Sequence, residues 1–301
     1  MFADIFFVSI LILGSITAVY TDFKRREVPD WINYFLIITG LLGHAIISLI
    51  QNSPKPLLCS ATVAFIFFIV ANVMYYTGSW GGGDAKFLVG LGALMPIYPQ
   101  TFLKLLNPTI AEWPFVITLF FNTLLFGAIL GILYTGYKAV KNWEKVRKEI
   151  VLILKRKSII ITRAVLLSSA ILIFLALLFF REFSGIIVFL WTMVILLFYS
   201  LILSMAVEKI SMFKKIKPSQ LTEGDWIAKD VKVDKEIIYK QKRTGIEIKD
   251  IKRLVELEKK GKLKEVIIKE GLPFLPAFLA GILFSLIFGD ILFKLFTTVL
   301  Y

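Results

Sequence analysis

Two aspartates stand at the ends of long apolar segments, where a charged side chain is costly and needs an explanation. Asp22 directly follows the first apolar run, and Asp84 ends the stretch Gly81-Gly82-Gly83-Asp84 between two further runs. When two carboxyl groups lie close together, one keeps its proton while the other is ionised. The ionised group can take a proton from water, and the protonated group can polarise a peptide carbonyl. This pattern predicts peptide hydrolysis without a metal or a cofactor.

The three glycines before Asp84 fit this chemistry. Without Cβ atoms, Gly81, Gly82 and Gly83 allow a substrate backbone to approach closely, and their loop can adopt conformations that other residues resist. Free N–H groups at the start of the following helix are available to bind a substrate or to steady Asp84. A phosphate-binding loop is a poorer interpretation, because the Gly-x-x-x-x-Gly-Lys-Ser/Thr spacing is missing.

Each aspartate also has a purely structural interpretation, which the residues alone leave open. Asp22 can be a juxtamembrane charge that pairs with Lys24 or Arg25. Asp84 can be a helix N-cap after a glycine-rich turn. Taken singly, these interpretations are strong, and it is the combination of the two sites that favours catalysis.

The segments around these residues are apolar enough to cross a membrane. The chain has 301 residues, of which 57% are hydrophobic, and its mean hydropathy is +0.78. A helix needs ~20 residues to cross a hydrocarbon core of ~30 Å. Runs near this length cover residues 2–20, 31–50, 57–77, 113–135, 159–180, 185–207 and 272–293, and a shorter run covers 85–98. The predicted fold class is an all-α polytopic membrane protein with about eight transmembrane helices and a small cytoplasmic α+β module.

The positive charge follows the predicted topology. The net charge is +13, and 31 of the 35 Lys and Arg residues lie in segments 21–30, 84–86, 138–163 and 208–271. With eight spans, these segments fall on one side of the membrane and the other four basic residues on the opposite side. The positive-inside rule therefore places both aspartates at the cytoplasmic face and both termini outside. Membrane lipids are expected partners of this charge, and nucleic acid is not.

The chain is expected to consist of five parts. They are an N-terminal membrane core with both aspartates (1–135), a basic amphipathic segment (136–158), a transmembrane helix pair (159–208), a soluble α+β module (209–271) and a C-terminal transmembrane helix (272–301). The basic segment is expected either to lie along the membrane surface or to extend the neighbouring spans. Its apolar stripe would contain Trp143, Val146, Ile150 and Ile153.

Four motifs together carry a family resemblance. They are Gly81-x-Gly83-Asp84, Asp22 with the following basic cluster and Val28-Pro29-Asp30, Leu221–Trp226 (LTEGDW) in the soluble module, and Glu270–Phe278 (EGLPFLPAF). The combination resembles the Gly-x-Gly-Asp intramembrane aspartyl peptidases. Within that group it is most similar to the archaeal preflagellin and prepilin peptidases of the type IV prepilin peptidase family. The resemblance covers about the first 100 and the last 80 residues, while the middle matches only as hydrophobic spans.

The resemblance implies a specific activity. Such an enzyme is an aspartic endopeptidase of the cell membrane that removes the short basic leader from precursors with class III signal peptides, namely archaellins and type IV pilin-like proteins. Asp22 and Asp84 match the two catalytic aspartates of the family. The resemblance implies cleavage at the cytoplasmic face and no cofactor.

Three charged neighbours are candidates for substrate binding. Glu27 and Asp30 are suited to a basic leader, and equally to pairing with the basic cluster that ends at Arg26. Lys86 is suited to lowering the pKa of Asp84 or holding a lipid phosphate, and also to snorkelling at the interface.

Other features limit what is carried over from the family. Cys59 is the one cysteine, so the paired Cys-x-x-Cys motifs of many bacterial prepilin peptidases are missing, and their metal-binding domain and N-methyltransferase activity are not expected. The presenilin branch carries a Tyr-Asp motif, whereas here Tyr20 stands two residues before Asp22. The main alternative from another class is an ion- or proton-coupled transporter that uses the same aspartates. Transporters bind near the bilayer midplane, however, and both aspartates are predicted at one face.

Overall fold

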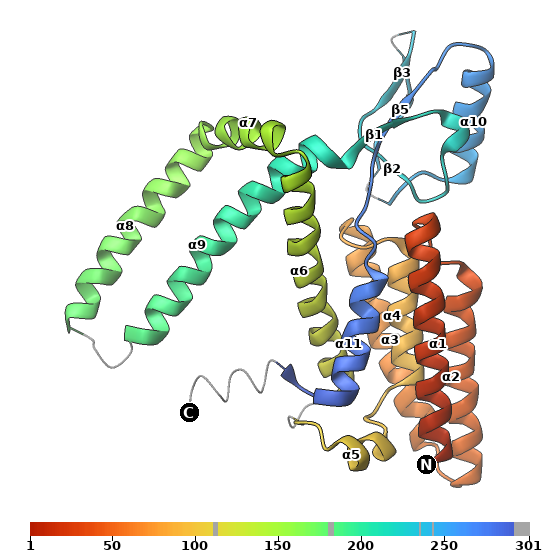
Figure 1. The fold of residues 1–301 in the computed structure, drawn as a ribbon. Coiled ribbons are helices and arrows are strands. Elements are labelled where there is room, and N and C mark those ends of the chain that lie inside the picture. Colours follow the sequence, from red (N-terminus) through yellow and green to blue (C-terminus); the bar gives the residue numbers. More distant parts are fainter. Residues whose placement is uncertain (111–113, 180–183, 235, 243, 292–301) are drawn as a thin grey trace. The chain divides into compact units, whose positions relative to one another are not determined.

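The computed structural model describes residues 1–110, 114–179, 184–234, 236–242 and 244–291 (Figure 1). The chain forms two compact units. The first contains Met1–Leu130, Ile216–Val266 and the chain from Gly271 onward, and the second contains Gly131–Lys215 and Ile267–Glu270. The boundaries of the five parts expected from the sequence stay predictions.

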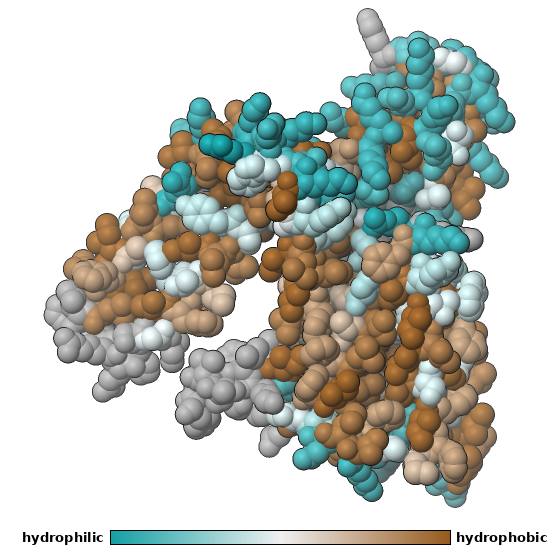
Figure 2. Space-filling view, viewed as in Figure 1, coloured by the Kyte–Doolittle hydropathy of each residue, from teal (hydrophilic) through white to brown (hydrophobic). Residues whose placement is uncertain are grey.

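Each of the eight predicted apolar segments forms a helix. In chain order these are α1 (Phe2–Arg25), α2 (Asp30–Ile50), α3 (Lys55–Tyr76), α4 (Gly82–Leu94), α6 (Phe115–Lys141), α8 (Lys157–Phe179), α9 (Ser184–Val207) and α11 (Leu275–Phe288). Within the described residues, six are long and apolar enough to cross a membrane, whereas α4 has 13 residues and α11 has 14. Figure 2 shows apolar side chains over the long helices and hydrophilic ones over the soluble module. The chain is a polytopic helical membrane protein, as predicted.

The short helix α4 packs tightly against α2 and α3 because small residues let the backbones approach. A Cβ atom on Gly40 of α2 would lie 2.6 Å from the carbonyl carbon of Ala93 in α4, and one on Gly92 would lie 2.9 Å from the Phe67 ring of α3. Ser60 of α3 donates a hydrogen bond of 2.7 Å to the Ala93 carbonyl. These contacts hold α4, and with it Asp84 in its first turn, against two long helices.

Buried polar contacts hold α11 in place. The Asn122 side-chain amide of α6 donates hydrogen bonds to the Ser285 hydroxyl and the Gly289 carbonyl over 2.8 Å and 2.9 Å. A Cβ atom on Gly281 would lie 2.8 Å from the backbone nitrogen of Thr123, so this pair also brings the two helices close. Away from water such bonds are costly to lose. They fix the later turns of α11 and so define where its first turn lies.

The soluble module is a small α+β structure, as predicted. After α9 and a five-residue π-helix (Glu208–Met212), it contains β1 (Phe213–Ile216), a 3₁₀ turn (Pro218–Gln220), β2 (Trp226–Ile227), β3 (Val231–Val233), β4 (Glu236–Tyr239), α10 (Ile248–Lys259) and β5 (Val266–Lys269). Three strands form a sheet in the order β1-β5-β2, and β3 pairs antiparallel with β4, Val231 opposite Tyr239. Its apolar core includes Ile227, Ile246 and Leu254, each 1% exposed.

The predicted basic segment divides into two pieces in the second unit. Its first residues continue α6 to Lys141, and α7 (Trp143–Leu154) follows as a separate amphipathic helix. Val146 and Ile153 are buried with residues of α9, whereas Trp143 is 53% exposed. The predicted apolar stripe is therefore buried against α9 at Val146 and Ile153, whereas Trp143 lies outside that contact. Placement of α7 along the membrane surface stays a prediction.

Candidate active site

Asp22 lies in the last turn of α1, where the helix leaves its apolar stretch. Arg26 caps the helix end, and its left-handed backbone (φ 59°) lets its N–H donate to the Asp22 carbonyl over 2.9 Å. The Asp22 residue is 7% exposed, and its carboxylate Oδ2 accepts a hydrogen bond of 3.2 Å from the Leu275 N–H. Leu275 is the first residue of α11, so this N–H is one of the donors that a helix start leaves without an internal partner. Lys24, a partner suggested by the sequence, donates instead to the Tyr20 hydroxyl.

Asp84 is the third residue of α4 and folds back over the glycine turn. Gly81 is the N-cap, and its N–H donates to Asp84 Oδ2 over 3.3 Å. The structural interpretation of Asp84 is therefore correct in part, because this carboxylate steadies the start of α4, although from the third helical position. The bond is long for an N–H to a carboxylate, and the residue is only half-buried. A capping role of this kind is compatible with chemistry at the same side chain.

The glycine turn rests on the segment that joins α1 to α2. A Cβ atom on Gly83 would lie 2.9 Å from the Val28 Cβ, which makes this position too tight for any other residue without movement. The Asn33 side-chain amide, fully buried on α2, donates a 3.4 Å hydrogen bond to the Gly83 carbonyl. The Val28-Pro29-Asp30 motif thus has a structural role, since its Val28 supplies a surface against which the glycine turn packs.

Four aromatic side chains join the start of α11 to the glycine turn. The Trp80 ring, 6% exposed, lies 5.3 Å from Phe274 and 5.4 Å from Phe278, and Phe87 lies 5.3 Å from Phe278. Such contacts are worth ~0.5–1.5 kcal/mol each beyond the apolar area they bury. Sequence reasoning did not single out Trp80, although its place directly before Gly81 is a signal. The other end of the cluster lies in the Glu270–Phe278 motif, which therefore belongs to the site.

The two carboxylates influence each other electrostatically. Asp84 lies outside the six helices that are long enough to cross a membrane. Burial, and then the negative charge of Asp22, raise the pKa of Asp84 to about 7, against a smaller lowering by the Gly81 N–H. A carboxyl group with this pKa is partly protonated at neutral pH. Asp22 therefore lies near enough to Asp84 to act on it electrostatically, and a catalytic role of this pair stays a prediction.

The other predicted site residues lie at the rim. The Lys86 ammonium contacts the Asp30 carboxylate at 2.6 Å, and both side chains are well exposed. It also lies 5.7 Å from the centre of the Tyr34 ring. An exposed ion pair of this kind contributes ~0–1 kcal/mol. Asp30 is therefore already paired with Lys86, whereas Glu27 is exposed on the turn between α1 and α2.

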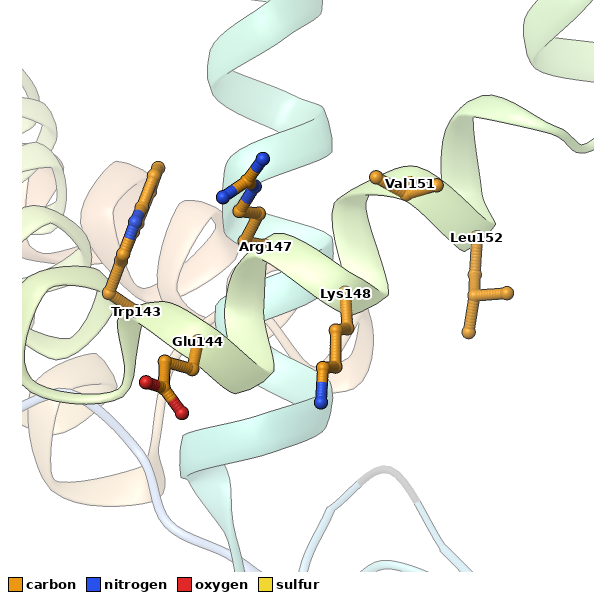
Figure 3. A pocket seen from close by; sticks show the side chains of 6 residues that line it. All are labelled: Trp143, Glu144, Arg147, Lys148, Val151 and Leu152. Atoms are coloured by element: carbon orange, nitrogen blue, oxygen red, sulfur yellow. The ribbon is translucent and has the colours of Figure 1, made fainter.

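A separate hollow lies along α7 and is shown in Figure 3. Its lining side chains all come from this helix, namely Trp143, Glu144, Arg147, Lys148, Val151 and Leu152. Among them are one carboxylate, Glu144, and two cations, Arg147 and Lys148, and this set does not provide a pair of carboxyl groups for acid–base chemistry. Among the described residues, no group of three or more His, Cys, Asp or Glu side chains is placed to hold a metal ion. The aspartate pair is the better candidate for an active site.

The part of the chain that holds both aspartates is similar to known peptidases. The model of the type IV leader peptidase family matches residues 9–134, which include both aspartates. The preflagellin peptidase of Methanococcus voltae is 32% identical over 158 residues, covering 51% of this chain and 67% of the relative. The prepilin peptidase EppA of Methanothermobacter thermautotrophicus is 24% identical over 378 aligned positions, covering 98% of each chain. The preflagellin peptidase of Methanococcus maripaludis is 37% identical over 121 residues, covering 38% of this chain and 52% of the relative.

The coupling between the carboxylates gives a first prediction. Asp22→Asn removes the negative charge that helps to raise the pKa of Asp84, so that pKa should fall, while burial keeps it above the ordinary value. Infrared difference spectroscopy of the carboxyl band, with Asp84→Asn as the subtraction reference, measures this pKa. The matched control is Asp30→Asn, whose carboxylate faces Lys86 and should leave the band of Asp84 in place. An unchanged pKa in Asp22→Asn would show that the two groups are not coupled.

Proposed function

This chain belongs to the type IV leader peptidase family, and we propose that it is an intramembrane aspartyl endopeptidase in which Asp22 and Asp84 activate the attacking water. It removes leader peptides from precursor proteins, as the preflagellin and prepilin peptidases among its relatives do by name. The proposed substrates are archaellin or type IV pilin-like precursors with a short basic leader. The observation that carries the proposal is the electrostatic coupling of the buried Asp22 and the half-buried Asp84, each at an end of an apolar helix.

The surroundings of the two carboxylates favour different roles. Asp22 accepts the first N–H of α11, and the positive end of a helix dipole stabilises a negative charge there. Asp84 has a raised pKa and retains a proton more readily. In the proposed mechanism Asp22 takes a proton from water, the water oxygen attacks the scissile carbonyl carbon, and Asp84 donates its hydrogen bond to the carbonyl oxygen. The proton that Asp22 took from water then passes to the amide nitrogen as the scissile C–N bond breaks, which releases the amine and leaves a new carboxyl group on the other product.

Substrate binding is proposed at the rim around the glycine turn. Gly81 and Gly82 carry no side chain, so in this proposal an extended backbone can approach Asp84 there; a Cβ at Gly81 would already touch the Asp84 carboxylate at 3.5 Å, and one at Gly82 the Tyr75 ring at 3.6 Å. The exposed Glu27 is the proposed contact for the basic leader. Asp30 can contribute only if the leader displaces Lys86 from its ion pair. The charge of Glu27 thus provides leader recognition, and the glycines provide access.

The proposed location of the site is the cytoplasmic face of the cell membrane. The support is the charge pattern, which puts 31 of the 35 basic residues on the side of the two aspartates. A leader that remains cytoplasmic before cleavage would meet the site there. The transporter alternative has no observation in its favour, because the matching family and the named relatives are peptidases.

The mechanism predicts that both aspartates are indispensable. Asp22→Asn and Asp84→Asn keep the side-chain size but remove the acid–base function, so each should lower the cleavage rate of a leader-bearing precursor by at least about 10²–10⁴-fold. The double variant should be hardly worse than either single variant, because the pair acts as one unit. The control is Glu256→Gln, an exposed acid on α10. Near-normal cleavage by Asp22→Asn would refute the pair, and near-normal cleavage by both variants would refute the peptidase mechanism.

The proposed membrane face predicts a labelling pattern. In a Cys59→Ser background, one variant carries a cysteine at Lys240 in the module and another at Asn107 in the turn after α5 (Gln100–Leu106). A membrane-impermeant thiol reagent added to intact cells should modify position 107 and should reach position 240 only after the membrane is opened. Labelling of position 240 in intact cells would place the module, and the aspartates with it, on the outer side.

A further inference from the structure

The Leu221–Trp226 motif lies in the soluble module and supplies no group to the proposed mechanism. Its residues form a tight turn in which the Asp225 carboxylate accepts the Thr222 N–H over 2.8 Å, and Gly224 takes a left-handed conformation (φ 91°). Two backbone hydrogen bonds of 2.9 Å then tie the turn to Ile246, one from the Gly224 N–H to the Ile246 carbonyl and one from the Ile246 N–H to the Asp225 carbonyl. The turn therefore fixes the segment just before α10.

The contact between the two segments is too close for side chains. Gly245 is left-handed (φ 84°), and a Cβ atom there would collide with the carbonyl of Gly224. Tyr239, 5% exposed, donates its hydroxyl hydrogen to the Gly245 carbonyl over 3.4 Å from the other side. Gly245 is thus held between the motif turn and the end of β4, which leaves the adjacent Thr244 with a defined position.

Thr244 connects the module to the membrane core. The Tyr75 hydroxyl, at the end of α3, donates a hydrogen bond of 3.2 Å to the Thr244 carbonyl. The Tyr75 ring also lies beside the glycine turn, where a Cβ atom on Gly82 would be 3.6 Å from it. Gly82 precedes the catalytic Asp84 by two residues. A continuous series of contacts therefore runs from the motif turn through Gly245, Thr244 and Tyr75 to the catalytic turn.

We propose that Tyr75 is a positioning residue that fastens the module beside the catalytic turn, so that the segment 244–247 forms one wall of the entrance through which the precursor reaches the aspartates. This inference rests on the proposed peptidase function. It also assigns a role to the Leu221–Trp226 motif, which sets the position of that wall through Gly224 and Gly245. Tyr75 acts through the module and not on the reacting atoms, so its loss should weaken substrate binding more than the chemical step.

The test uses the full chain in proteoliposomes with a leader-bearing precursor. Tyr75→Phe removes only the hydroxyl, and Tyr76→Phe is the matched control, because Tyr76 is the neighbouring residue and is 66% exposed. One neutral hydrogen bond has a modest net effect, so Tyr75→Phe should raise KM by roughly 3- to 10-fold with kcat changed less than about twofold. Tyr76→Phe should match the original chain.

A second pair of variants tests the motif turn. Gly245→Ala and Gly261→Ala both place alanine at a left-handed position, but only the first collides with Gly224, since nothing lies within 4 Å of a Cβ at Gly261. Gly245→Ala should raise KM as Tyr75→Phe does, and Gly261→Ala should not. If backbone strain alone were responsible, KM would rise equally in Gly245→Ala and Gly261→Ala, and this result would contradict the proposed role of the motif turn.

A measurement without substrate separates this proposal from the peptidase function. The Thr244–Ile246 amides should exchange with solvent deuterium several-fold faster in Tyr75→Phe than in Tyr76→Phe, at an unchanged global unfolding temperature. If these amides exchange faster in Tyr75→Phe but the original chain cleaves no precursor, the link between Tyr75 and the segment 244–247 stands and the peptidase proposal fails. If the chain cleaves precursor, and Tyr75→Phe has the exchange rates and KM of Tyr76→Phe, the link is wrong. A fall in kcat at unchanged KM would also overturn it, because Tyr75 would then act on the chemistry.

Discussion

A carboxylate at the end of a membrane helix must find hydrogen-bond donors, and the rest of the site is arranged around the way Asp22 finds one. It accepts the first N–H of α11, a residue 253 positions later in the chain. This single contact brings the beginning and the end of the sequence to one place and directs a helix dipole at the group proposed to hold the negative charge. The Trp80, Phe274 and Phe278 rings then join that helix start to the turn that carries Asp84.

Close backbone approach is the second constraint on the site. Asp84 can sit beside Asp22 only because α4 is drawn against α2 and α3 through Gly40 and Gly92, and because Gly83 leaves room for Val28. Close backbone approach recurs in the module, where Gly224 and Gly245 are in contact. This contact fixes the segment 244–247, whose Thr244 carbonyl accepts the hydrogen bond from Tyr75. Glycine therefore lets structural elements pack closely near the proposed catalytic turn, and in the proposed mechanism it also gives a substrate backbone access to Asp84.

The sequence could predict the parts of this structure that depend on local composition. Apolar run length was sufficient to place the eight helices. Residue type with the predicted topology suggested the pair Asp22 and Asp84, and its catalytic role stays a prediction. Partners distant in the chain carry no such local signal, which is why the Leu275 N–H, the Trp80 cluster and the Tyr75 contact emerged only from the fold. The sequence left open whether Lys86 acts on Asp84, holds a lipid phosphate or snorkels, and the structure shows its ammonium paired with Asp30. On α7, periodicity identified an apolar face but not that this face packs on α9 and leaves Trp143 exposed.

The central claim is that positions 22 and 84 meet, and chemical cross-linking in the native membrane tests it most directly. In a Cys59→Ser background, Asp22→Cys with Asp84→Cys is treated with a short bifunctional thiol reagent, and linked peptides are measured by mass spectrometry. The control pair is Asp4→Cys with Asp84→Cys, because Asp4 lies 18 residues earlier on α1, which is about 27 Å along the helix. The account predicts a strong 22–84 cross-link and hardly any 4–84 cross-link. A 22–84 yield no higher than that of the control pair would contradict it.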